Sequence, residues 1–421
     1  QTSNYTARGT RTTRPNLLGY DDGSRNDKQV QLVEGSQPMT AQDGIDFKRR
    51  LVMMIATDEN HSYTLDIQRM KGGTVHENFL RQVEEEDVDF TTDLNLPTEM
   101  EGKLSGWLTS IGRSGGVGAI ADALTSPRGI ETNDDYSFSW HGKVSGTTLN
   151  VFLKGNSGTA VAFSQFPTMR RVKNVVADKD KYPGMHMYQR VDVSPSDTTM
   201  FGGVYEAFRN GETARVKGIE WLQPEDKDPM CVLAKVDLGD SVDYVYVSGD
   251  NKPRQFEGMT FSGNYAALRK EKGSGKTVWS YLYGQGSITA DGVNVQGEKD
   301  YLFKVLEARG SDDDVSIPNQ MKVRGSLPES VKGLWGHSIF GDTSGFGYQI
   351  LDVDQSTITV QMPPGFIVTE KGAEMTHFPK YEDPKTGQIQ NKEGLYSTFT
   401  PRVIAGDAWF ELKVPTFKRY Q

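Results

Sequence analysis

Apolar and polar residues alternate along most of the chain with a period of two, the pattern of strands that bury one face. The clearest examples are residues 47–55 and 62–70. The second segment is followed by Lys71-Gly72-Gly73, a composition that favours a tight turn. We therefore expect these two strands to form a hairpin or a meander. Further alternating segments occur at residues 136–140, 148–153, 159–163, 202–208 and 242–247.

Turn residues separate these segments at intervals of about 8–12 residues, a spacing typical of sandwiches rather than of βαβ units. After about residue 254 the pattern continues in shorter pieces, at residues 256–261, 279–283, 348–353 and 357–361. Helical windows are scarce. The best of them, residues 104–124, is interrupted by four glycines, each of which costs about 1 kcal/mol relative to alanine inside a helix. This window is interpreted as a mobile insertion with at most a short helix.

The pattern predicts an all-β fold. A large antiparallel β-sandwich of stacked sheets is expected over residues 1–250, with a Gly-rich insertion near residues 101–135. A continuation of the sheets and a smaller C-terminal β domain are expected over residues 251–421. The length of 421 residues is consistent with two or three domains. The 45 glycines, about 11% against a usual value of roughly 7%, favour a chain that turns often.

The charge balance limits the partners that the chain could bind. The formal net charge is −9, so the surface as a whole has no electrostatic reason to bind a polyanion, and no nucleic-acid partner is expected. An acidic ligand would need a local basic cleft. The single cysteine, Cys231, excludes an intramolecular disulfide and a cysteine-based metal cluster. No apolar run reaches the roughly 20 residues that span a bilayer, and residues 1–30 contain no signal-peptide core.

Motifs for metal, phosphate and nucleophile chemistry are weak. No two of the six histidines lie closer than fifteen residues, and no His-x-x-x-His pair occurs, so no metal or other cofactor is predicted, although distant strands could still assemble a metal site. The stretch 272–277 ends like a phosphate loop, but Lys270 stands where its first glycine belongs, and its flanks have a strand pattern. We interpret it as a hairpin turn. No Gly-x-Ser-x-Gly elbow is present, and Cys231 lies in an apolar strand-like segment.

Residues 60–80 form the most suggestive stretch. Alternation would place Tyr63, Leu65 and Ile67 on one face of a strand, and serine, threonine, aspartate and glutamine side chains on the other. His61 and His76 would then lie near the ends of consecutive strands. A polar face of this kind binds sugar hydroxyls or faces water, and the residues alone leave both readings open.

Within this stretch, an aspartate-bearing apolar strand precedes the pattern Arg-x-Lys-Gly-Gly-x-x-His-x-x-Phe-Leu, from Arg69 to Leu80. This pattern resembles the C-terminal β-sandwich half of heparinase II/III-like polysaccharide lyases. Later segments, at residues 136–140, 148–153 and 201–209, follow in the order of that family. The similarity covers roughly residues 14–250.

The resemblance implies an N-terminal (α/α) toroid followed by stacked antiparallel sheets. It also implies cleavage of uronate-containing acidic polysaccharides by β-elimination, with a secreted, periplasmic or cell-surface location. In such enzymes a tyrosine and a histidine or asparagine come from the toroid, and a further histidine with a structural metal site comes from the start of the sheets. This chain contains no toroid, and it has Arg14-Pro15-Asn16 where that family often has His-Asn-Thr. Catalytic and metal residues are therefore left unassigned, and Arg69, His76 and His61 are the expected substrate-binding residues.

The first hypothesis is therefore the C-terminal β-sandwich portion of such a lyase, whose toroid and main catalytic residues lie outside this chain. The start at Gln1 is consistent with a processed protein or a fragment, and the chain alone is expected to be inactive. The alternative is a non-catalytic carbohydrate-binding or structural β-sandwich protein. Its sugar-stacking candidates are Trp107, Trp140, Trp221, Trp279 and Trp335.

Overall fold

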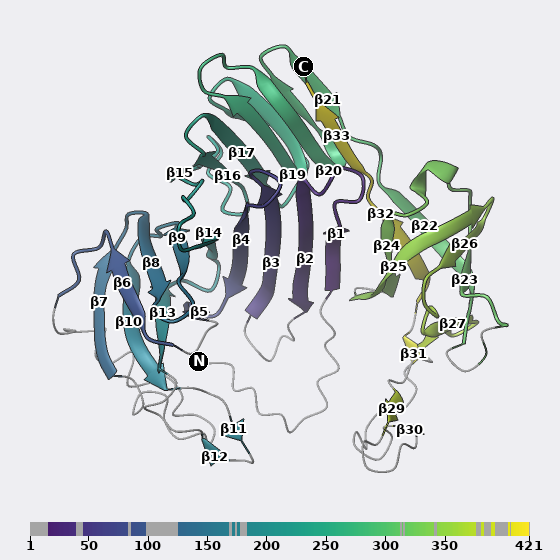
Figure 1. Cartoon of the computed structure of the whole chain (residues 1–421). Helices are drawn as coiled ribbons and strands as arrows, with labels where there is room; N and C mark the ends of the chain where they lie inside the picture. The colour runs from purple at the N-terminus through teal and green to yellow at the C-terminus, as the bar shows by residue number, and fades with distance from the viewer. Residues whose placement is uncertain are drawn as a thin grey trace. The chain divides into compact units, whose positions relative to one another are not determined.

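The fold of the described chain is all-β, as the alternation predicts (Figure 1). The structure is a computed structural model, and the residues that it describes are 16–38, 45–82, 86–97, 125–167, 171–172, 175–176, 183–311, 314, 316–340, 343–375, 380–382, 389–391, 403–404 and 406–420. Across these residues the regular structure consists of β-strands and a short 3-10 turn, η2 (Glu329–Val331). Among them, no helix is long and apolar enough to cross a membrane.

The chain divides into two compact units. Unit 1 comprises residues 1–9, 39–247 and 269–276, and unit 2 comprises residues 10–38, 248–268 and 277–421. The main change of unit along the chain falls between Val247 and Ser248. The two folding domains expected on either side of residue 250 stay a prediction. The expected Gly-rich insertion lies outside the described residues as far as residue 124, and from Thr125 the chain forms a strand.

The first sheet of unit 1 is antiparallel and contains the predicted hairpin. Its strand order is β3 (Ile45–Ala56), β4 (Ser62–Gly72), β14 (Thr198–Arg209), β9 (Thr147–Leu153), β8 (Tyr136–Gly142) and β6 (Val88–Thr92). β3 pairs with β4 from Ile45 opposite Gly72 to Ala56 opposite Ser62, which confirms the hairpin. Gly72 and Gly73 have φ angles of 91° and 75°, a conformation that favours glycine, and they turn the chain into β5 (Val75–Arg81).

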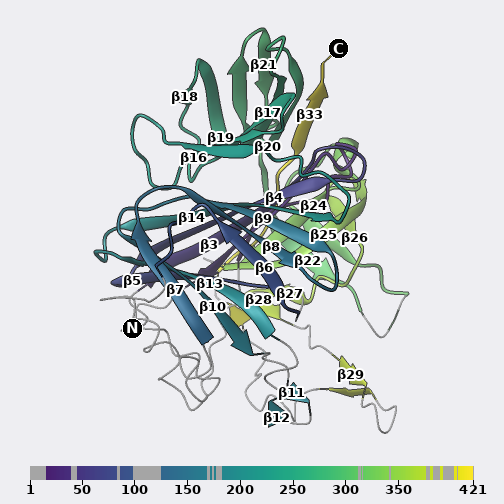
Figure 2. The ribbon, with the colours of Figure 1, turned by 60° about the vertical axis from the view of Figure 1, so that its left-hand side comes forward.

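The second sheet of unit 1 packs on the first, as expected of a sandwich. Its order is β5, β13 (Pro183–Asp192), β10 (Thr159–Pro167) and β7 (Thr125–Thr132). Figure 2 shows β10 and β13 in a layer beneath β8 and β9. The side chains between these layers form a buried aromatic and aliphatic core: Tyr136, Phe138, Trp140, Val151, Leu153, Val161, Phe163 and Met187. β11 (Arg171–Val172) and β12 (Val175–Val176) form a small separate hairpin.

Unit 1 also contains β15 (Gly218–Leu222), β16 (Val232–Asp237) and β17 (Ser241–Val247), which pair in that order. The loop that resembles a phosphate loop joins β19 (Met259–Glu271) to β20 (Thr277–Ala290). Its Glu271 N–H donates to the Lys276 carbonyl oxygen at 2.9 Å. No helix follows this loop, so the prediction of a hairpin turn is confirmed.

Unit 2 carries the smaller C-terminal β structure that the sequence predicts. β1 (Asn16–Asp21) pairs with β2 (Val30–Pro38), and β18 (Arg254–Phe256), β21 (Val293–Gln296) and β33 (Pro415–Arg419) belong to the sheet of β19 and β20. A closed barrel then follows, with the order β22 (Tyr301–Arg309), β23 (Gln320–Val323), β26 (Thr357–Val360), β25 (Thr343–Asp354), β24 (Trp335–Phe340) and β32 (Ala408–Leu412). One small sheet consists of β27 (Phe366–Thr369), β28 (Gly372–Met375) and β31 (Val403–Ile404). Another consists of β29 (Lys380–Glu382) and β30 (Ile389–Asn391).

Candidate functional site

Two of the three predicted substrate-binding residues lie inside the protein. The side chain of Arg69, on β4, has no exposed surface, and its Nη1 donates to the Met230 carbonyl oxygen at 3.1 Å. His76, on β5, is 4% exposed; its Nε2 lies 2.7 Å from the Gly72 carbonyl oxygen and its Nδ1 lies 2.7 Å from the Thr199 hydroxyl. A carbonyl oxygen only accepts hydrogen bonds, so Nε2 donates to Gly72, and the Thr199 hydroxyl is the partner of Nδ1. This geometry favours structural roles, and substrate binding by these residues stays a prediction.

The third predicted residue, His61, lies in an accessible turn. It ends the connection between β3 and β4, and its side chain is 19% exposed. Asp58 builds this turn, because its Oδ1 accepts from the N–H groups of Asn60 and His61 at 2.9 and 3.0 Å. The same oxygen lies 2.8 Å from His61 Nδ1. The imidazole is therefore held at one nitrogen by a carboxylate that the backbone fixes in place.

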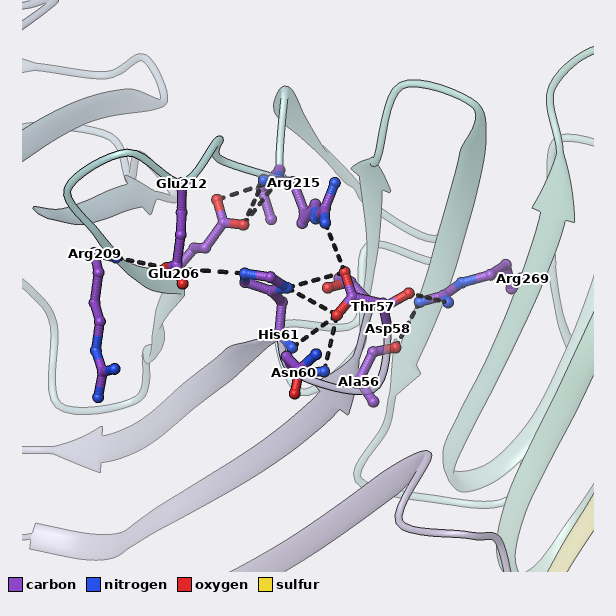
Figure 3. Close-up of polar contacts among 11 residues, drawn as sticks. Ala56, Thr57, Asp58, Asn60, His61, Glu206, Arg209, Glu212, Arg215 and Arg269 are labelled. Atoms are coloured by element: carbon purple, nitrogen blue, oxygen red, sulfur yellow. Dashed lines mark hydrogen bonds and ion pairs between the residues drawn. The ribbon is translucent and has the colours of Figure 1, made fainter.

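A second loop, between β14 and β15, completes the charged network shown in Figure 3. Arg215 Nη2 lies 2.9 Å from Asp58 Oδ2. Glu212 Oε2 lies 3.8 Å from His61 Nε2 and accepts from the Arg209 N–H at 2.7 Å. In the same view the Arg209 side chain extends away from the imidazole. We call Asp58, His61, Glu212 and Arg215 the His61 network.

Backbone groups and burial set the charge states around the network. The hydrogen bond from the Asn60 N–H, followed by the contacts with His61 and Arg215, lowers the pKa of Asp58 to about 2. Glu206, which is 3% exposed, accepts from the Arg215 N–H at 2.6 Å, and burial raises its pKa. Asp58 is therefore ionised at neutral pH, and Glu206 is held inside by the same loop that presents Arg215.

A buried ion pair holds the turn that carries His61 through its backbone. Arg269 donates to the carbonyl oxygens of Ala56 and Thr57 at 2.9 and 3.4 Å, as Figure 3 shows. Its guanidinium also donates to both carboxylate oxygens of Asp243, from Nε at 2.6 Å and from Nη2 at 2.8 Å. The Tyr63 hydroxyl donates to Asp243 Oδ2 at 2.8 Å. The position of the turn is thus fixed by contacts that lie within the core of unit 1.

The network is suited to hydrogen bonding with a neutral partner. Its acidic side chains, Asp58 and Glu212, face one permanent cation, Arg215, and one imidazole. An acidic local balance repels the carboxylate of a uronate but suits hydroxyl groups, which both donate and accept. Within the described part of the chain, no group of three or more His, Cys, Asp or Glu side chains could hold a metal ion.

The three predicted residues do not form one site. His61 precedes β4, whereas Arg69 lies eight residues further along it, which corresponds to about 26 Å of extended strand. Most of the tryptophans proposed for sugar stacking lie inside the protein. Trp140, Trp221 and Trp279 are buried, and Trp335 packs against Tyr20 and donates to Asp22 at 3.2 Å. Trp107 lies outside the described residues.

Comparisons with known proteins return little. No family model matches the chain, and no curated protein matches it. A search of solved structures finds the heparan sulfate lyase HepC from Pedobacter heparinus, in a mutant form, with a TM-score of 0.32 and 11% sequence identity. The match covers 56% of this chain and 28% of that protein, so it spans less than a third of the lyase. At this level the likeness carries no conclusion about function.

Proposed function

We propose that this chain is the C-terminal, all-β portion of a heparinase II/III-like polysaccharide lyase. In this role it binds a uronate-containing polysaccharide, while the (α/α) toroid and the main catalytic residues belong to another region or chain. The proposal is supported by the motif from Arg69 to Leu80 and by the order of the antiparallel strands. It implies a secreted, periplasmic or cell-surface location, where such polysaccharides occur.

The observation that carries the proposal is the fixed and accessible imidazole of His61. Its Nδ1 is bound to Asp58, which leaves Nε2 on the side of Glu212, 3.8 Å away. A sugar ring presents neighbouring hydroxyl groups that donate and accept, and it would pair with an imidazole, a carboxylate and a guanidinium at once. Because the buried Arg269 fixes the turn, the imidazole of His61 loses little freedom on binding.

The test is calorimetric titration of the isolated chain with alginate, glycosaminoglycan and ulvan oligosaccharides, together with ultraviolet detection of unsaturated uronate. We expect binding of at least one of these glycans without release of unsaturated product. His61→Gln should weaken binding at least about threefold, the effect of losing one hydrogen bond. His141→Gln is the matched control, because His141 is half-buried on β8 and bonds Thr148 at 2.8 Å, outside the His61 network.

Two results would overturn this proposal in different ways. Absence of binding to all three glycan classes would remove the polysaccharide from the proposal. Clear release of unsaturated uronate by the chain alone would show that the catalytic residues are present within it.

A further inference from the structure

The barrel of unit 2 carries a polar hollow on its outer surface. The hollow has a volume of about 320 Å³, and each residue that lines it is polar or charged. Its walls come from β22, β23 and β26 and from the turn that joins β25 to β26. This volume lies at the lower end of the range of small-molecule pockets, so the hollow suits one small ligand or one unit of a longer chain.

The side chains of the hollow point away from the barrel core because strands alternate. Met321 and Val323 are buried in that core, so Lys322 between them faces outwards. On β26, Ile358 is buried in the same core, and Thr357 before it faces outwards. The hollow is therefore a feature of the outer face, and its side chains are free to take polar types without a cost to the core.

Strand pairing places four of the lining residues in one row. Glu307 on β22 lies opposite Lys322 on β23. Lys322 also lies opposite Thr357 on β26, and Thr357 lies opposite Asp354 on β25. Residues that face each other in this way have Cβ atoms about 5 Å apart. We call Glu307, Lys322, Thr357 and Asp354 the Lys322 row; all four line the hollow.

The polar groups of the Lys322 row have no partner within the described part of the chain. Glu307, Lys322 and Asp354 are exposed, and their side chains form no ion pair or hydrogen bond with another residue that the structure describes. The same holds for the Thr357 hydroxyl, which is half-buried. A ligand in the hollow would therefore meet two carboxylates that accept, one ammonium group that donates and one hydroxyl that does both.

A second pair of residues fixes a guanidinium at the border of the hollow. Arg309 on β22 donates to the side-chain oxygen of Gln320, which lies directly opposite it on β23. The Gln320 amide in turn donates to the Thr359 hydroxyl at 3.2 Å. Arg309 and Gln320 both line the hollow. Because a guanidinium has five N–H groups, Arg309 keeps donors for a ligand after it binds Gln320.

The charges of the hollow cancel, and their order excludes an ionic ligand. Glu307 and Asp354 balance Lys322 and Arg309, and Lys322 stands between the two carboxylates in the row. An anionic group next to Lys322 would be repelled by the carboxylates, and a metal ion would be repelled by the ammonium group. An uncharged ring with neighbouring hydroxyl groups avoids both penalties, because each hydroxyl can donate to a carboxylate and accept from a cation.

We propose that the Lys322 row, with Arg309 at its border, is a binding site for an uncharged sugar residue. The binding of a hydroxylated ring rests on the hollow and its free polar groups alone. Its assignment to an uncharged sugar within the uronate-containing polysaccharide rests on the proposed function. Unit 2 then has a glycan contact of its own, separate in sequence and in chemistry from the His61 network of unit 1.

The experiment uses the full chain with His61→Gln, so that the His61 network contributes less to binding. The probes are glucose, galactose, mannose and N-acetylglucosamine, with glucuronate as the acidic counterpart of glucose. Binding is followed by saturation-transfer NMR at sugar concentrations up to about 50 mM, which covers weak affinities. Lys322→Gln and Asp354→Asn each remove one charge from the row, and the thermal midpoint reports whether each variant folds.

Lys332→Gln and Asp352→Asn are the matched controls. These two residues form an exposed ion pair at 2.6 Å in unit 2, and Asp352 lies on β25, the strand that carries Asp354. Neither of them lines the hollow. The controls therefore change the same charges on the same unit without removing a group from the proposed site.

We expect at least one uncharged sugar to bind, with an affinity that changes little with salt because the ligand carries no charge. Lys322→Gln and Asp354→Asn should each weaken this binding at least about threefold, with both controls close to unaltered. The site is wrong if no uncharged sugar binds, or if binding is the same in the two variants and the controls while all of them fold. Tighter, Lys322-dependent binding of glucuronate than of glucose would also refute an uncharged ligand.

The site and the proposed function can fail separately. If an uncharged sugar binds through Lys322 and Asp354 but no alginate, glycosaminoglycan or ulvan oligosaccharide binds the chain, the hollow stands and the proposed function fails. If these oligosaccharides bind and depend on His61, but no uncharged sugar depends on Lys322 or Asp354, only the site in unit 2 fails.

Discussion

The buried ion pair between Asp243 and Arg269 gives a sharp test of how unit 1 holds the His61 turn. Asp243 has no exposed side-chain surface, and the Arg269 side chain is 10% exposed. Replacement of Asp243 by asparagine keeps the shape but removes the charge. Arg269 keeps the carbonyl oxygens of Ala56 and Thr57 as acceptors but loses its anionic partner, and the Tyr63 hydroxyl loses the same carboxylate.

The expected cost follows from burial. Removal of one partner of a buried ion pair costs about 3–5 kcal/mol, because the remaining charge stays out of water without compensation. Asp237 and Lys272 provide a matched control in the same unit. Their side-chain atoms are 2.6 Å apart, but both side chains are about two-fifths exposed, at 41% and 42%. An exposed pair of this kind contributes about 0–1 kcal/mol, so Asp237→Asn should be close to neutral.

Urea unfolding gives the total change in stability, and hydrogen exchange of peptides from β4 and β17 places it in unit 1. We expect Asp243→Asn to lower the free energy of unfolding by at least about 3 kcal/mol and to speed exchange in both strands. The double replacement Asp243→Leu with Arg269→Met should recover part of the loss, because no unpaired charge remains. If Asp243→Asn and Asp237→Asn cost the same small amount, the argument from burial is wrong.

Three other positions have defined expectations. Burial lowers the pKa of His186 to about 4. The neutral imidazole therefore contributes its full stability above about pH 6.5, and the free energy of unfolding falls by up to about 3 kcal/mol as the pH drops towards 4. In His186→Gln the midpoint of urea unfolding should change less over this pH range. Because the pKa of Asp58 is lowered to about 2, its ionised form stabilises the fold above about pH 4, and this stabilisation is lost between about pH 4 and 2. Acid unfolding of Asp58→Asn should lack this loss of stability. Gly203→Ala would place a methyl group 2.7 Å from the Tyr205 hydroxyl oxygen and should cost about 1–3 kcal/mol in urea, whereas Gly218→Ala, which meets nothing within 4 Å, should change stability by less than about 0.5 kcal/mol.

Local patterns in the sequence were sufficient for the fold class and for the β3–β4 hairpin. Alternation along residues 62–70 places Tyr63, Leu65 and Ile67 inside, and all three have no exposed surface. The same alternation could not show what covers the other face. Gln68 on that face donates to Asn78, and Asn78 donates to Gln189 on β13, so the predicted polar face is in part a hydrogen-bonded layer between two sheets.

In the candidate site, too, the sequence could indicate contacts between neighbouring residues but not contacts between distant ones. Asp58 and His61 are three residues apart, and an aspartate that bonds the backbone two residues later is a turn signal that a sequence can show. Glu212 and Arg215 come from a loop far along the chain, and only the pairing of β14 with β4 brings that loop to the turn. Long-range strand pairing leaves no local pattern, so the sequence could not predict the network.

The glycines of β14 show how a local residue choice depends on long-range packing. A glycine inside a strand weakens it, and it persists where another group must approach the backbone closely. Gly202 meets the Trp221 ring, with a Cβ position 3.0 Å from its Cη2 atom, and Gly203 meets the Tyr205 hydroxyl on the opposite face. Two neighbouring glycines therefore admit one aromatic ring on each side of the sheet. The glycine excess that the sequence assigns to turns therefore also serves close packing, and at Gly203 the missing side chain leaves room for the Tyr205 hydroxyl.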